Sequence, residues 1–149
     1  MTYYKYIFFL IINFSVCDAF EFSRFYSPVS YSSNGSIYGK LHFNNRYCLI
    51  SAVSPVCKFV ELHTHISDNG VKKMRRVEAV NLPSLTSVFF KTGGFHLMLM
   101  NLKFYINEND LIPLKLIFNI KENTFAFAVV KEKRFFFYDF NKLRTTSRD

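Results

Sequence analysis

Histidine and methionine are concentrated in one part of the chain. Three of the four His and three of the four Met lie between His63 and Met100. His96 and Met98 are two residues apart in an expected strand, so their side chains leave the same face. An imidazole and a thioether that project together are soft, neutral donors suited to Cu(I). The alternative is structural, with Met98 filling the core and His96 satisfied by hydrogen bonds.

A second group of candidate ligands lies on the expected strand that precedes the strand of His96. Glu61, His63 and His65 alternate along it and therefore share a face. A short turn then brings Met74 back beside them. If Asn69–Gly70 form the loop, Met74 lies opposite His65, whereas the two other short loops that fit place it opposite His63. The spacing alone leaves both registers open.

Several neighbouring residues are weaker candidates for a role at this site. Glu61 is either a partner that orients an imidazole or a solvated carboxylate. We expect His65 to be a surface residue, with assistance in metal capture as the alternative. Met100 is expected in the core, and His42 has no motif support.

A run of cations surrounds Met74, formed by Lys72, Lys73, Arg75 and Arg76. It is either a solvated hairpin or a surface that docks onto an acidic partner.

The elements expected to position these residues are strands. Short runs rich in β-branched and aromatic residues alternate with polar turns, and no segment of a dozen residues shows convincing helical periodicity. This pattern predicts an all-β, antiparallel sandwich or barrel. The expected strands are 36–43, 47–53, 56–66, 71–80, 87–91, 95–104, 112–120 and 124–131.

The length and composition favour one exported domain. A chain of 149 residues that is 50% hydrophobic can bury a core. Residues 1–19 resemble a secretory signal peptide cleaved after Ala19, with an uncleaved membrane anchor as the alternative. A lipoprotein signal at Cys17 is less favoured, because Phe14 stands where such signals usually have Leu. We expect a copper-binding β-sandwich domain at 20–131 and a tail at 132–149, with an edge strand at 135–138. The net charge of +8 suggests an acidic partner, and export argues against nucleic acid.

The cysteines and the absence of common catalytic motifs say little about what the protein binds. Cleavage would remove Cys17, and we expect Cys48 and Cys57 to be small buried hydrophobes on strands. The sequence has no G-x-S-x-G, phosphate-binding glycine loop, H-E-x-x-H or C-x-x-C. We therefore expect that the protein is not an enzyme.

Four of these residues are spaced as in a known family. His63, Met74, His96 and Met98 follow the pattern H-x(10)-M-x(21)-H-x-M, which resembles that of the PCu(A)C-type periplasmic copper chaperones. The flanking VELH, Met-Arg and GG-x-H-x-M-L segments are similar too, and the resemblance covers about residues 36–131.

The resemblance implies a fold, a site and a role. The fold would be a cupredoxin-like Greek-key β-sandwich in which His63, Met74, His96 and Met98 hold one Cu(I), with Met74 opposite His63. The protein would be a periplasmic chaperone without stable membrane insertion after signal cleavage. Its acceptor would be the dinuclear copper centre of cytochrome c oxidase subunit II or a thioredoxin-like copper chaperone. The alternatives are a copper-sequestering or resistance protein and an exported interaction module without metal.

Overall fold

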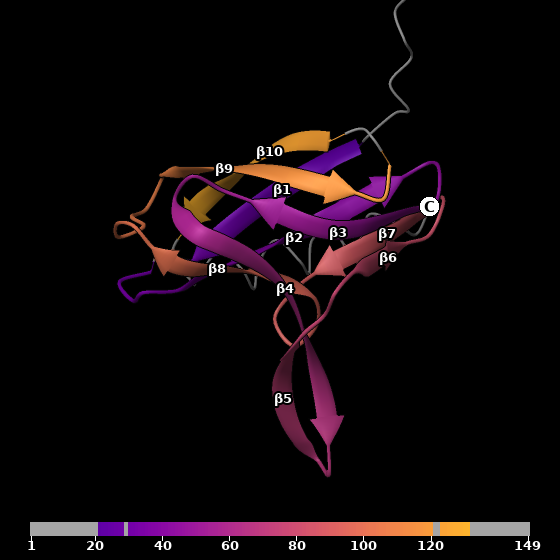
Figure 1. Ribbon diagram of the computed structural model, residues 1–149, viewed down its shortest axis with the longest axis horizontal. Coiled ribbons are helices and arrows are strands. Elements are labelled where there is room, and N and C mark those ends of the chain that lie inside the picture. Colours follow the sequence, from indigo (N-terminus) through magenta and orange to yellow (C-terminus); the bar gives the residue numbers. More distant parts are fainter. Residues whose placement is uncertain (1–20, 29, 121–122, 132–149) are drawn as a thin grey trace, which may run out of the picture.

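A computed structural model describes residues 21–28, 30–120 and 123–131. Within them the chain forms ten strands (Figure 1), and no helix there is long and apolar enough to cross a membrane. The expected signal peptide and the tail with its edge strand lie outside the described residues. The strands are β1 (Glu21–Pro28), β2 (Gly35–Phe43), β3 (Tyr47–Val53), β4 (Cys57–Asp68), β5 (Val71–Arg76), β6 (Val80–Leu82), β7 (Thr86–Phe90), β8 (His96–Leu102), β9 (Leu111–Phe118) and β10 (Asn123–Lys131).

Strand β2 connects the two parts of the sheet. Its first residues pair with β8 and its later residues pair with β7, while its other edge pairs with β1. The order is β5-β4-β8-β2-β1-β10-β9-β3-β6. Among the described strands the pairs are antiparallel, except that β1 and β10 run parallel. The all-β, largely antiparallel prediction is therefore confirmed.

Strand β1 was not expected from the sequence. Its register against β2 shifts between Ser23 and Tyr26, which interrupts the alternation of inward and outward side chains. Only Phe25 and Ser27 are known to be buried on it, and the strand ends at Pro28. A strand with so little alternation gives a weak sequence signal.

The expected strand 71–80 is wrong as one element. Strand β5 ends at Arg76, and the chain leaves β4 after Val77, whose amide still donates to the Leu62 carbonyl at 2.8 Å. It then pairs with β3 as β6. The hydrophobic pattern runs through this crossover because Val77 still packs against the core.

Strand β8 separates the core from the face that carries His and Met. Leu97 and Leu99 are fully buried in the hydrophobic core. Met98 and Met100 lie on the opposite face and are only partly buried. The expectation that Met100 belongs to the core is wrong, because it pairs with the exposed Phe59.

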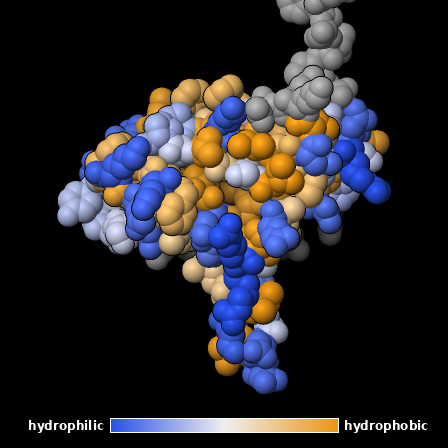
Figure 2. All heavy atoms as spheres, viewed as in Figure 1, coloured by the Kyte–Doolittle hydropathy of each residue, from blue (hydrophilic) through white to orange (hydrophobic). Residues whose placement is uncertain are grey.

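A two-stranded arm projects from the body (Figure 1). We use the word arm for residues 64–75, where β4 pairs with β5 but no longer with β8. Its turn has positive φ at Asn69 (51°) and Gly70 (77°), as a two-residue Asn-Gly hairpin requires. Figure 2 shows hydrophilic residues along much of the arm, with apolar side chains exposed among them, such as those of Ile66 and Val71.

Candidate metal centre

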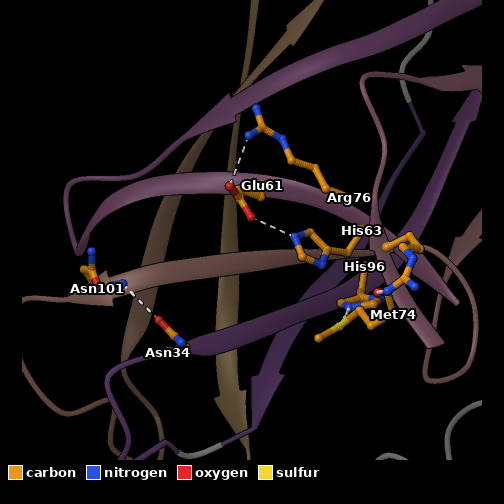
Figure 3. Close-up of polar contacts among 8 residues, drawn as sticks. Asn34, Glu61, His63, Met74, Arg76, His96 and Asn101 are labelled. Carbon is orange, nitrogen blue, oxygen red and sulfur yellow. Dashed lines mark hydrogen bonds and ion pairs between the residues drawn. The ribbon is translucent and has the colours of Figure 1, made fainter.

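His63, Met74 and His96 lie together where the arm joins the body (Figure 3). His63 is the last residue of β4 that pairs with β8, and it lies opposite His96 there. On its other edge His63 pairs with Arg76 of β5. Because opposite residues of an antiparallel pair share a face, His63 and His96 project to the same side. Their ring centroids are 5.8 Å apart.

The same register places the remaining donors on this face. Met98 lies opposite Glu61 on β4 and opposite Ser36 on β2. Met74 lies opposite His65, one pleat further along the arm. The four residues of the spacing pattern therefore lie on one face of β4, β5 and β8.

The expected partner of Met74 is wrong. The resemblance favoured His63, but Met74 pairs with His65. The physical reason is the turn: Asn69 and Gly70 both tolerate positive φ, so they form the loop by themselves and Asp68 pairs with Val71.

His96 is held in one protonation state. It is 2% exposed, and its Nδ1 lies 3.0 Å from the Gly94 carbonyl oxygen. A carbonyl oxygen only accepts, so Nδ1 carries the proton and Nε2 keeps its lone pair. Burial, as the largest effect, lowers the pKa of His96, which keeps the ring neutral.

The free nitrogen of His96 faces a sulfur atom. Nε2 lies 3.0 Å from Sδ of Met74, whose side chain is 44% exposed (Figure 3). With the proton on Nδ1, neither atom has a hydrogen to donate to the other. Two lone-pair donors that converge in this way are suited to a soft cation.

His63 is oriented by a carboxylate. Its Nε2 donates to Oε2 of Glu61 at 2.8 Å, and Oε1 of Glu61 accepts from Arg76 at 3.3 Å. Glu61 therefore contacts the imidazole, which decides between the two roles expected for it. The Nδ1 atom of His63 is left buried without a hydrogen-bond partner. Such an atom costs about 1–3 kcal/mol when it stays unpaired.

His65 faces the same space, which the sequence did not favour. Its ring centroid is 5.2 Å from that of His96, and its Nδ1 is also buried without a hydrogen-bond partner. The expectation of a surface residue is wrong, because His65 is partly buried here. The Asn-Gly turn was the available signal, since it sets the register that brings His65 beside Met74.

The donor set fits copper through its sulfur atoms. In the described part of the chain, no three His, Cys, Asp or Glu side chains form a metal-binding group by themselves. Methionine sulfur beside these imidazoles is the kind of soft donor that Cu(I) prefers. Both described cysteines are free thiols, with Cys57 buried as expected and Cys48 only partly buried. His42 is engaged elsewhere, with its Nδ1 3.2 Å from the Ser87 hydroxyl.

The chain is similar to a known protein family. The chain matches the family described as LpqE-like, a lipoprotein family, over residues 25–129. No curated protein matches it.

Solved structures share its fold. The apo PCuAC domain of PmoF1 is 16% identical, with a TM-score of 0.60 over 76% of this chain and 92% of that one. The copper-bound PCuAC domain of PmoF2 is 19% identical, with a TM-score of 0.59 over 76% and 91%. CuI-DR1885 from Deinococcus radiodurans is 20% identical, with a TM-score of 0.61 over 74% and 77%.

The family match covers most of the chain, and the structural neighbours have the expected cupredoxin-like β fold. The resemblance found in the His and Met spacing is thereby confirmed. The chain belongs to the LpqE-like family of PCuAC-type domains.

Proposed function

We propose that this protein is an exported copper chaperone that binds one Cu(I) and delivers it to an acceptor protein. The proposed ligands are His63, Met74, His96 and Met98. The observation that carries the proposal is the 3.0 Å approach of His96 Nε2 and Met74 Sδ, two donors without a proton between them. The role is binding and transfer rather than catalysis.

The donor chemistry supports Cu(I) as the cargo. Thioethers favour Cu(I) over harder ions, and imidazole adds affinity without charge. Unlike thiolates, thioethers do not form disulfides in an oxidising compartment. The copper-bound PmoF2 domain and CuI-DR1885 share the fold of this chain, which supports copper as its cargo.

Transfer requires that the ion can leave. Met74 is 44% exposed on the arm, whereas His96 is 2% exposed. A thioether is also a weaker donor than an imidazole. We therefore propose that Met74 exchanges for an acceptor ligand before His96 does, and that the arm enters the encounter first.

The apolar segment at residues 1–19 and the lipoprotein description of the family support export. The proposed acceptor is cytochrome c oxidase subunit II or a thioredoxin-like copper chaperone.

Removing two ligands tests the site. The variant His96→Ala, Met98→Leu is expected to lose Cu(I) affinity by more than the roughly 10- to 100-fold that loss of an outer partner costs. Anaerobic titration against a chromophoric Cu(I) chelator measures it. The matched control is His42→Ala, Met100→Leu, which changes the same residue types outside the proposed ligands. Equal affinity in the two variants would contradict the site.

Replacing Glu61 tests whether this carboxylate orients the imidazole of His63. Glu61→Ala removes the acceptor of the 2.8 Å bond, so the ring can turn or change tautomer. We expect a loss of about 10- to 100-fold in Cu(I) affinity in the same titration. Glu78→Ala removes the same charge from an exposed residue and should bind like the unaltered protein. Indistinguishable behaviour of the two variants would refute the role of Glu61.

Replacing cations of the arm tests whether this surface docks onto the acceptor protein. Lys73 is paired with Asp68 at 2.6 Å and Arg76 with Glu61, whereas Arg75 donates to the Met74 carbonyl oxygen at 3.1 Å. Lys72 and Arg75 form no ion pair among the described residues, so they are the cations to replace.

Lys72→Gln, Arg75→Gln is expected to slow Cu(I) transfer to the apo copper domain of subunit II about tenfold at low salt. Stopped-flow mixing at several salt concentrations measures the rate. Lys58→Gln, Lys103→Gln is the control with equal charge change on exposed body residues. Identical rates and salt dependence for both variants would sink the docking proposal.

A further inference from the structure

We infer that His65 is an additional copper ligand, acting through Nδ1 on the side of the site that faces the arm. This inference rests on the proposed copper-binding function and extends its ligand set beyond the four residues of the spacing pattern. Three independent features of the structure carry it.

The first feature is strand register. Met74 lies opposite His65 rather than His63, and its sulfur reaches His96 Nε2 at 3.0 Å. An ion held between Met74 and His96 therefore lies between the level of His65, which is opposite Met74, and the level of His63, which is opposite His96. Directly opposite residues of an antiparallel pair have their Cβ atoms about 4.5–5.5 Å apart. His65 is thus the nearest imidazole on β4 to the Met74 backbone.

The second feature is ring spacing. Metal–nitrogen bonds of about 2 Å place the centroids of two imidazoles that share an ion about 5 to 6 Å apart. His65 and His96 are separated by 5.2 Å, and His63 and His96 by 5.8 Å. Both pairs fall in this range, so the ring spacing does not favour His63 over His65.

The third feature is an unused lone pair. Nδ1 of His65 is buried and has no hydrogen-bond partner among the described residues. A buried polar atom normally finds a partner, and an imidazole nitrogen without one is available to a metal. Nδ1 of His63 is also buried without a hydrogen-bond partner, but Nε2 of His63 is hydrogen-bonded to Glu61. The two rings therefore flank His96 from successive positions on one strand face.

The consequence is a site that extends along β4. His96 and Met74 would bind the copper together with the two histidines of β4, with His63 on the side of the body and His65 on the side of the arm. A ligand on the arm side lies where an approaching acceptor first meets the copper. His65 would thus hold the ion while the other ligands exchange.

Nitrogen chemical shifts test this directly in the unaltered protein. Long-range ¹H–¹⁵N spectra of the labelled protein are recorded before and after one equivalent of Cu(I). We expect the Nδ1 resonance of His65 to shift together with Nε2 of His96, while His42 is unchanged. A shift at His96 without one at His65 would overturn the inference and leave the proposed function standing. No shift at any histidine would overturn both.

A variant gives the second measurement. His65→Gln is expected to weaken Cu(I) binding at least about tenfold in the chelator titration, since even outer partners contribute that much. His42→Gln is the control with the same substitution. An affinity equal to that of the control would reject His65 as a ligand. If His65→Gln fails to fold by circular dichroism, the nitrogen shifts of the unaltered protein decide the question.

Discussion

The proposed copper site depends on strand β4 being paired on both edges at one point. His63 lies opposite His96 on β8 and opposite Arg76 on β5. Without the β8 pairing, the arm would have no fixed position relative to the buried imidazole. Without the β5 pairing, Met74 would not be returned to the same face. Backbone hydrogen bonds thus supply the alignment, and the side chains supply only the donors.

The donors are prepared by their neighbours. A carbonyl oxygen of Gly94 and a carboxylate of Glu61 each accept from one nitrogen of an imidazole, and this leaves the other nitrogen free. Burial keeps His96 neutral by lowering its pKa. Such outer partners fix the tautomer and orientation of a ligand before the ion arrives. Because Met74 is exposed, one side of the proposed site faces solvent.

Much of the fold could be predicted from the sequence because alternation is strong where one strand face is buried. On β2 and β9 nearly every second residue is buried, and both strands were predicted within one or two residues. Strand β1 was missed because a register shift interrupts its pattern. The single strand expected at 71–80 was wrong because apolar residues continue through the crossover from β5 to β6.

The site was predictable in part, for a related reason. A spacing of two residues reports a shared face, so the grouping of His96 with Met98 and of Glu61 with His63 followed from the sequence. The pairing of Met74 did not, because three short loops fit the same residues. The positive φ of Asn69 and Gly70 decides it in favour of His65.

X-ray absorption at the copper edge of the Cu(I)-loaded protein tests the central claim most directly. The account predicts a first shell that contains both thioether sulfur and imidazole nitrogen around one Cu(I). A first shell of nitrogen and oxygen alone, without sulfur, would contradict it.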